Sequence, residues 1–222
     1  MAWRVAPAAP RVLLVSPVLS AHHDAGLYWL AALSRRDIPV VVWDYRVDPL
    51  PPNADYSLAL VLKGETIDPD TLKRPRVVYW PDDPSRTPGI WSRLKKYDLV
   101  ACCVPNLMNT FWLPTGYDPL VHRPLSNSVR RHVVLCGTRT DRKEMFADAL
   151  MGAGLLPYRN IHGNGWETIN AWIRPVYARD YVLMLSSAMV SVNVHREEIG
   201  VNRRLFESMA CTFTLTDLVP GV

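Results

Sequence analysis

The sequence predicts an α/β protein that contains two parallel β-sheets with helices on their faces. Short continuous apolar runs alternate along the chain with segments whose apolar residues recur at helical spacing. Such runs are typical of strands buried on both faces of a parallel sheet. One proline-rich segment near the middle interrupts the alternation. The composition, with 49% hydrophobic and 21% charged residues among 222, is that of a folded globular protein.

The first half of the chain contains five predicted strands. Residues 11–17 form the first apolar run, and residues 24–36 follow as a helix with leucines at helical spacing. Asp24 is a suitable N-cap for this helix, because its carboxylate can accept a hydrogen bond from the first turn. The other predicted strands are residues 39–44, 56–62, 76–80 and 99–104, and a second helix is predicted at residues 89–96.

A linker is predicted after these elements. Residues 113–124 hold three prolines and one glycine, and residues 125–131 add serine, asparagine and arginine. Gly and Pro at this density are typical of a connection between units. We therefore predict an N-terminal domain over residues 1–124 and a C-terminal domain over residues 125–222.

The second half repeats the alternation of strands and helices. Predicted strands are residues 132–137, 158–162, 189–194 and 213–215, and predicted helices are residues 143–151, 175–184 and 203–211. Strands that alternate with helices or long crossovers imply a parallel sheet with both faces covered. Both domains are therefore expected to be Rossmann-like.

Charge and cysteine content narrow the functional class. The net charge of +4 is spread evenly along the chain, so charge alone does not indicate nucleic-acid binding, although it permits an anionic ligand. The four cysteines show no C-x-x-C spacing, which argues against a zinc site and fits a reducing compartment such as the cytoplasm. No apolar run approaches the ~20 residues that a membrane span needs.

The most informative segment is residues 193–217, which places many charged side chains between two predicted strands. The helix predicted at residues 203–211 begins after the carboxyl end of a strand. Unpaired backbone N–H groups and the helix dipole favour an anionic ligand at such a position. Glu207, one turn further along, is suited to accept hydrogen bonds from sugar hydroxyls. The segment therefore predicts a nucleotide-sugar site.

This segment also carries a resemblance to a known family. Residues 200–207, GVNRRLFE, and residues 214–217, TLTD, resemble the donor-site motif of GT-B glycosyltransferases. The closest branch is the one named for the spore maturation protein CgeB. Residues 79–84, residues 113–118 and the turn from Gly137 to Arg142 also fit that branch. The resemblance runs from about residue 76 to residue 217.

The resemblance implies two Rossmann-like domains that face a cleft, with the C-terminal domain holding most of the donor. The donor is a nucleotide-diphosphate sugar, such as a UDP- or GDP-sugar, and no metal or other cofactor is implied. Cationic side chains and helix N-termini replace the metal by offsetting charge on the leaving diphosphate. The implied donor-binding residues are Gly137, Arg142, Lys143, His195, Glu198, Asn202, Arg203 and Glu207.

The sequence departs from the family pattern at two points. Many retaining GT-B enzymes carry two glutamates separated by seven residues, whereas Glu198 and Glu207 are separated by eight. The catalytic part of that motif is therefore not carried over. The chain also stops at Val222, before several elements that the family pattern places after the donor motif. We expect a truncated C-terminal domain: a fragment, a pared-down form or a half-enzyme that another chain or an oligomer completes.

The catalytic candidates follow the first and fourth predicted strands. His22 and His23 precede Asp24, and a histidine oriented by a carboxylate can deprotonate an acceptor hydroxyl. Asp82 and Asp83 can take the same proton or bind acceptor hydroxyls. The alternative for the histidines is a solvated loop followed by a helix cap. The alternative for the two aspartates is a capped turn before a proline. Three aromatic residues are candidate stacking surfaces: Tyr79, Trp80 and Trp166.

The function predicted is a cytoplasmic, metal-independent glycosyltransferase of the hexosyltransferase type. Its N-terminal domain would select an acceptor hydroxyl on a glycan, a protein, a small molecule or a hydroxymethylated pyrimidine in DNA. A basic cluster keeps the nucleic-acid acceptor open: Arg74, Arg76, Arg86, Arg93, Lys95 and Lys96. The alternative is a non-catalytic relic that binds a nucleotide or a partner protein. The lack of G-x-G-x-x-G after the first strand argues against an oxidoreductase.

Overall fold

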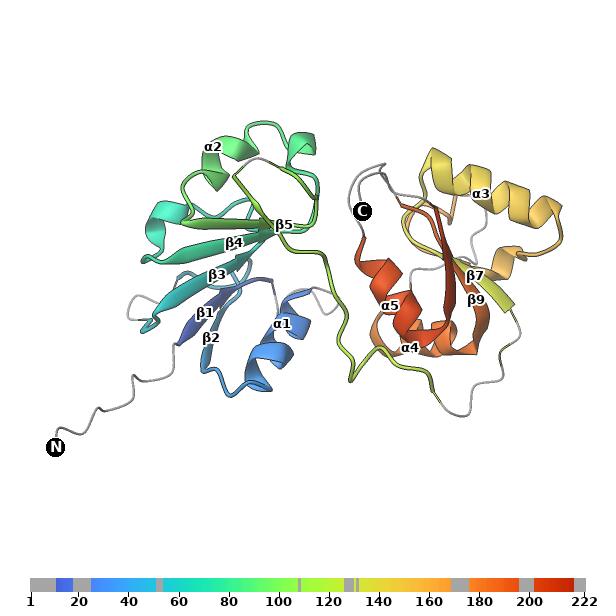
Figure 1. Cartoon of the computed structure of the whole chain (residues 1–222), viewed down its shortest axis with the longest axis horizontal. Helices are drawn as coiled ribbons and strands as arrows, with labels where there is room; N and C mark the ends of the chain where they lie inside the picture. The colour runs from blue at the N-terminus through green and yellow to red at the C-terminus, as the bar shows by residue number, and fades with distance from the viewer. Residues whose placement is uncertain are drawn as a thin grey trace. The chain divides into compact units, whose positions relative to one another are not determined.

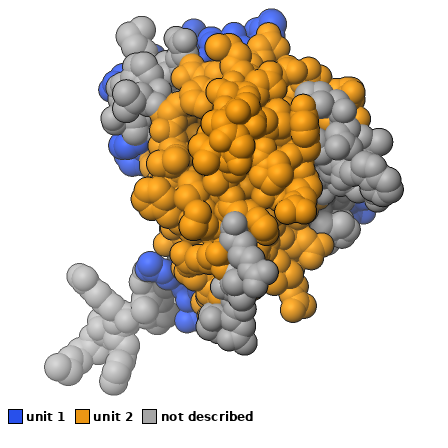
Figure 2. All heavy atoms as spheres, turned by 90° about the vertical axis from the view of Figure 1, so that its right-hand side faces the viewer, with its two compact units in different colours: residues 1–102, 106–113 blue, residues 103–105, 114–222 orange. Residues whose placement is uncertain are grey.

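The computed structural model describes residues 11–17, 25–50, 54–107, 109–125, 130, 132–168, 176–195 and 202–217. The chain divides into two compact units, which Figure 2 distinguishes by colour. Unit 1 contains Met1–Cys102 and Asn106–Leu113, and unit 2 contains Cys103–Pro105 and Pro114–Val222. Within the described ranges, no helix has both the length and the apolar character needed to cross a membrane.

Unit 1 is built on a six-stranded parallel sheet with the order β2-β1-β3-β4-β5-β6. The strands are β1 (Val12–Val15), β2 (Val40–Trp43), β3 (Leu58–Leu62), β4 (Arg76–Trp80), β5 (Leu99–Cys102) and β6 (Phe111–Trp112). The helices are α1 (Ala25–Ser34) and α2 (Ile90–Leu94), with short 3₁₀ turns η1 (Pro69–Thr71) and η2 (Pro84–Arg86).

The core of unit 1 explains why these runs form strands. All four residues of β1 are buried, as expected for a central parallel strand. Helix α1 covers one face through Leu27, Leu30 and Leu33, which pack against a cluster that includes Leu14. The helical spacing of these leucines was the signal that predicted the helix. Strand β6 was not predicted, because a two-residue strand carries no periodicity.

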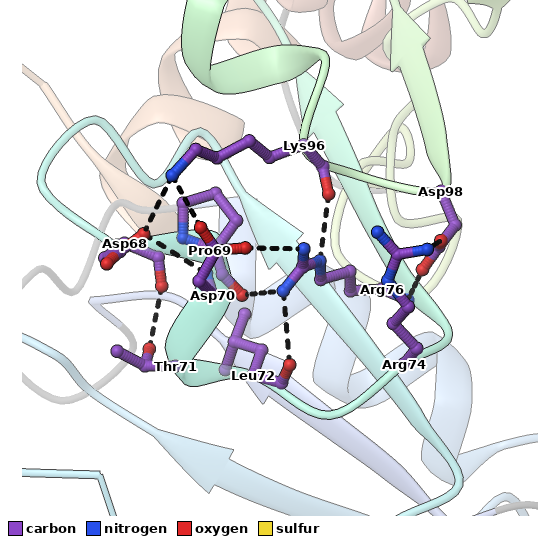
Figure 3. Close-up of polar contacts among 9 residues, drawn as sticks. All are labelled: Asp68, Pro69, Asp70, Thr71, Leu72, Arg74, Arg76, Lys96 and Asp98. Carbon is purple, nitrogen blue, oxygen red and sulfur yellow. Dashed lines mark hydrogen bonds and ion pairs between the residues drawn. The ribbon is translucent and has the colours of Figure 1, made fainter.

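Arg76 organises a polar network at the amino end of β4 (Figure 3). Its guanidinium donates to the carbonyl oxygens of Pro69, Leu72 and Lys96, and it pairs with Asp70 at 2.8 Å. The side chain of Arg76 is buried, so the network satisfies a charge that would otherwise be costly to bury. Arg76 therefore joins η1, β4 and the turn before β5 into one structure.

Unit 2 is built on a four-stranded parallel sheet with the order β10-β9-β7-β8 (Figure 1). The strands are β7 (His132–Cys136), β8 (Ile161–His162), β9 (Ala188–Asn193) and β10 (Phe213–Thr216). The helices are α3 (Asp141–Gly152), α4 (Ala178–Ser187) and α5 (Arg203–Cys211), with a 3₁₀ turn η3 (Tyr158–Asn160) before β8.

Both faces of this sheet are covered. Leu135 of β7 packs in a cluster with Ala147 of α3, whereas its neighbour Val134 packs with Leu185 of α4 and Cys211 of α5. Successive side chains of a strand point to opposite faces, so α3 lies on one face and α4 and α5 on the other. The two parallel sheets confirm the predicted α/β fold class.

The proline-rich segment predicted as a linker belongs to unit 2 from Pro114 onward. Asp118 and His122 of this segment are buried. The backbone N–H of Asp118 donates to His122 Nδ1 at 3.2 Å, and the backbone N–H of His122 donates to the Asp118 carbonyl oxygen at 2.7 Å. These bonds fold the segment onto itself. The assignment of acceptor and donor roles to two domains stays a prediction.

Candidate functional site

The carboxyl ends of the parallel strands meet at one edge of the sheet in unit 2. Strands β7, β8, β9 and β10 end there at Cys136, His162, Asn193 and Thr216, and α3 begins after β7. In open α/β sheets, ligands bind outside the carboxyl ends of the strands, where loops and helix N-termini gather. We call this region the carboxyl edge of unit 2. Of the predicted donor residues, Gly137, Arg142 and Lys143 follow β7 and His195 follows β9. Asn202 and Arg203 begin α5 (Arg203–Cys211), and Glu207 lies one turn further along that helix.

A tight backbone contact shapes the turn after β7. The Gly137 N–H donates to the His162 carbonyl oxygen at 2.8 Å, and Trp166 Nε1 donates to the Gly137 carbonyl oxygen at 2.8 Å. A Cβ on Gly163 would lie 2.1 Å from that same carbonyl oxygen, and Gly163 has a φ of 147°. Only glycine fits there. Trp166 is fully buried, so its predicted role in stacking on a base was wrong.

Two cations converge on Gly137. A Cβ on this residue, whose φ is 130°, would lie 2.9 Å from Lys143 Nζ and 3.3 Å from Arg204 Nη1. Lys143 is buried and donates to the Thr138 carbonyl oxygen at 3.2 Å. Like charges repel, so such a pair is stabilised by an anion between or beside them. The end of the Lys143 side chain occupies the space that a Cβ on Gly137 would need.

Helix α5 presents its two arginines differently. Asn202 is the N-cap, and its Oδ1 accepts from the Leu205 N–H at 3.0 Å. Arg203 Nε pairs with Glu207 Oε1 at 2.9 Å, one turn along the helix. Arg204, which we did not predict as a site residue, is the arginine that reaches Gly137. Helical spacing could have found it, since Arg204 shares a face with the buried residues Ser208 and Cys211.

Glu207 is buried between partners within unit 2. In addition to Arg203, its Oε1 lies 3.6 Å from Nε2 of His122, which is itself buried. The carboxylate thus joins α5 to the segment 114–125. Its predicted contact with a ribose or sugar stays a prediction.

The two cysteines near Glu207 are protonated thiols at neutral pH and not reactive thiolates. Burial raises the pKa of Cys136 to about 12, against the opposing influence of Arg204 and Lys143. Burial, with a smaller effect of the Glu207 charge, raises the pKa of Cys211 to about 11. The thiolate is the reactive form, so neither cysteine supplies a nucleophile at neutral pH.

Asp217, at the end of β10, joins Arg142 of α3 to His195 at the end of β9. Its Oδ1 accepts from the His195 backbone N–H at 2.9 Å and lies 2.6 Å from His195 Nδ1, while its Oδ2 lies 3.0 Å from Arg142 Nη2. Burial alone would raise the pKa of Asp217. The hydrogen bonds from His195 and the charges of His195 and Arg142 outweigh burial and lower this pKa.

His195 leaves one polar atom unpaired. Its side chain is only 2% exposed, and Nε2 has no hydrogen-bond partner among the residues that the structure describes. Buried polar atoms are nearly always hydrogen-bonded, so an exception marks a place for a ligand or water. Asp217 was not among the predicted site residues, although it closes the TLTD motif.

The predicted catalytic aspartates lie in unit 1, after β4. Asp82 pairs with Lys63 at 2.8 Å, and Lys63 also pairs with Glu65 at 3.1 Å. Partial burial would lower the pKa of Lys63, but the two carboxylates outweigh burial and raise it. Asp83 caps η2 by accepting from the Ser85 N–H at 2.9 Å. This is the capped turn that the sequence analysis gave as the alternative to a catalytic role.

The remaining predictions concern the aromatic residues of unit 1, the residues outside the described ranges and the absence of a metal. Tyr79 and Trp80 are buried in the sheet of unit 1, so the stacking surface predicted there was wrong. His22, His23 and Glu198 lie outside the described residues. In the part of the chain that is described, no group of three or more His, Cys, Asp or Glu side chains is arranged to hold a metal ion. Metal independence stays a prediction.

Residues 139–222 match a known family. The matching family is described as "Glycosyl transferase-like", and the match spans α3, α4, α5 and strands β8 to β10. It therefore includes Arg142, Lys143, His195, Arg204 and Asp217. No curated protein matches the chain. The match supports a general role in glycosyl transfer, and it begins after β7 and Gly137.

A separate pocket of about 480 Å³ lies at the other end of unit 2, where α5 ends and β10 begins. It is lined by Pro124, Arg130, Met209, Ala210, Cys211, Thr212, Phe213 and Thr214. Met209 and Phe213 are exposed, and Arg130 is the one charged residue in the lining. The cations described above are absent from it, so this pocket is not the candidate site.

Proposed function

We propose that the chain is a glycosyltransferase that binds a UDP- or GDP-sugar at the carboxyl edge of unit 2. The observation that carries this proposal is the convergence of Lys143 and Arg204 on Gly137. Two cations beside a glycine, next to the N-terminus of α3, favour a diphosphate. The glycosyl transferase-like match includes both cations.

These residues would act mainly on the leaving group. In the transfer, the bond between the anomeric carbon and the diphosphate oxygen breaks, and the oxygen keeps the electron pair. Lys143 and Arg204 would stabilise the charge that develops there, so no metal would be required. The acceptor oxygen forms the new bond, and its proton passes to a base. His22, His23, Asp82 and Asp83 remain the candidate bases.

The proposal extends to a CgeB-like hexosyltransferase that works in the cytoplasm, with unit 1 selecting the acceptor. A glycan, a protein, a small molecule and modified DNA remain candidate acceptors. Part of the basic cluster that favoured DNA already forms ion pairs with carboxylates of unit 1. Arg74 pairs with Asp98, and Arg76 and Lys96 pair with Asp70. The case for a nucleic-acid acceptor therefore rests on Arg93 and Lys95.

Calorimetric titration with UDP, GDP and their sugar conjugates tests the donor site. We expect the wild-type chain to bind one of the two nucleotide families and Arg204→Ala to weaken that binding about 10- to 100-fold, because a charge-assisted hydrogen bond is lost. Arg179→Ala, which removes an exposed arginine from α4, is the matched control and should bind like the wild type. If no nucleotide binds the wild type, the proposed function is wrong.

A non-catalytic nucleotide-binding protein is the second candidate. The observation that favours it is the pairing of Glu207 with Arg203 and His122, which occupies a carboxylate expected at the donor. Release of free nucleoside diphosphate from a bound nucleotide sugar separates the two candidates. A chain that binds the donor but releases no diphosphate, with or without a mixture of acceptors, belongs to the second.

A further inference from the structure

We propose that the amino edge of unit 2 docks on an anionic lipid surface, with arginines at the lipid phosphates and exposed apolar side chains between the headgroups. The amino edge is the end of the sheet where β7, β8, β9 and β10 begin, opposite to the carboxyl edge. We call its exposed part the amino-edge patch and define it by six residues: Arg123, Arg130, Arg159, Met189, Met209 and Phe213. The inference goes beyond the proposed function and does not rest on it, because no predicted donor residue belongs to the patch.

A shared pocket and backbone contacts bring the centre of the patch together. The pocket of about 480 Å³ is lined by Arg130, Met209 and Phe213, among others. Thr212 Oγ1 donates to the Ala188 carbonyl oxygen at 2.8 Å, which holds the start of β10 beside the start of β9. Met189, the second residue of β9, is therefore next to the pocket.

Two further contacts extend this surface across the edge of the sheet. Ser186 Oγ, at the end of α4, donates to the Arg123 carbonyl oxygen at 3.4 Å, so Arg123 lies close to the start of β9. Asn160 Nδ2 donates to the Val133 carbonyl oxygen at 3.0 Å, which holds Arg159 of η3 beside the start of β7. The amino-edge patch is thus continuous along the edge.

The charge of the amino edge has one sign. The segments that lead into the four strands are residues 123–132, 149–160, 184–189 and 208–213, and they contain arginines but no lysine, aspartate or glutamate. Arg123, Arg130 and Arg159 are exposed. Arginines that cluster on one surface attract anionic lipids, and each adds to the affinity.

The same surface exposes large apolar side chains. Met209 is 62% exposed and Phe213 is 63% exposed, and Met189 is also exposed. Contact with water is unfavourable for these side chains, whereas the boundary between lipid headgroups and acyl chains can bury them. Exposed apolar side chains among cations therefore favour a membrane surface as the partner.

Two other partners fit the amino-edge patch less well. Pairing of the patch with the same patch on a second copy of the chain would bring arginines against arginines, which costs free energy. A nucleic acid would match the charge through its phosphates, but it offers Met209 and Phe213 a polar backbone. An anionic lipid surface matches both the charge and the apolar side chains.

Sedimentation with lipid vesicles tests the proposal. We expect the wild-type chain to bind phosphatidylcholine vesicles that contain phosphatidylglycerol more tightly than vesicles of phosphatidylcholine alone, with an affinity that falls as salt is added. Arg130→Gln and Met209→Ser should each weaken binding about fivefold. The matched controls are Arg179→Gln and Met145→Ser, which change an exposed arginine of α4 and an exposed methionine of α3 and should bind like the wild type.

Fluorescence quenching locates the contact on the molecule. Phe213→Trp adds an indole to the amino-edge patch, and Met145→Trp adds one to α3 as the control. Brominated phosphatidylglycerol should quench the added emission of Phe213→Trp and leave that of Met145→Trp unchanged. Equal quenching of the two would overturn the inference.

The vesicle experiment has other outcomes that would overturn the inference. One is an absence of binding or an equal affinity for both kinds of vesicle, and another is wild-type affinity in both Arg130→Gln and Met209→Ser. Self-association that Met209→Ser abolishes would assign the patch to a second copy of the chain. Tighter binding to a DNA duplex than to the vesicles, lost in Arg130→Gln and kept in Met209→Ser, would assign it to nucleic acid. The nucleotide titration tests the proposed function separately, and Arg130→Gln should bind nucleotide like the wild type.

Discussion

At the scale of single residues, the carboxyl edge of unit 2 depends on a few side chains whose pairing was not visible in the sequence. Arg142 and Lys143 are neighbours, yet one binds Asp217 and the other the turn at Gly137. Residue type and the motif pointed to both cations. Their partners depend on how β7, β9 and β10 align, which the sequence does not state.

The stability of the protein at acidic pH should depend on the ionisation of Asp217. Its folded-state pKa lies below the unfolded value of 3.8, so its contribution to stability is present above that value and is lost as pH falls through the folded pKa. We expect Asp217→Asn to be less stable than the wild type at pH 7, with the difference shrinking below about pH 4. Urea unfolding at several pH values measures this.

The control for Asp217 is Asp148→Asn, which changes an exposed aspartate in the middle of α3. That variant should follow the wild type across the pH range. A constant stability difference between wild type and Asp217→Asn from pH 7 to pH 3 would contradict the lowered pKa.

Gly163 carries the tightest backbone contact of the site. Gly163→Ala places a Cβ against the Gly137 carbonyl oxygen and keeps a φ that side chains disfavour. We expect unfolding free energy to fall by about 2–3 kcal/mol, measured by chemical denaturation. Gly116→Ala is the control, since a Cβ there meets nothing within 4 Å. Equal stability of the two variants would show that the turn relaxes freely.

At the scale of elements, the sequence predicted the main strands and helices because periodicity and capping agree along most of the chain. Arg203–Cys211 was predicted with its exact bounds, since Asn202 caps it and Thr212 follows in extended conformation. Strand β6 and the 3₁₀ turns were missed. They are short, and their position depends on neighbours rather than on local pattern.

The network of Arg76 makes a prediction about unit 1. Arg76→Met removes a donor to three carbonyl oxygens and a partner of Asp70. Within the described residues, only the Pro69 oxygen keeps another hydrogen bond, from the Leu72 N–H, so unit 1 should lose about 2–4 kcal/mol of stability. Hydrogen exchange along β4 and β5 measures the loss locally. Lys95→Met, at an exposed position after α2, is the control. Unchanged protection in Arg76→Met would mean that water satisfies the carbonyls.

At the scale of the whole molecule, two parallel sheets of similar design carry different chemistry at their carboxyl ends. In unit 1, Lys63 is held by Asp82 and Glu65, so its charge is balanced. In unit 2, Lys143 and Arg204 share one turn. The family match falls wholly within the second unit. Fold class was predictable from patterning, whereas this difference required the positions of the side chains.

The burial of Glu207 changes how a common mutagenesis result must be interpreted. Truncating this glutamate to alanine would remove a buried carboxylate that pairs with both Arg203 and His122. The segment 114–125 would then lose the contact with α5 that Glu207 provides. An inactive alanine variant would then report a loosened scaffold as readily as a missing donor contact, and only a glutamine replacement, which keeps the shape, can tell the two apart.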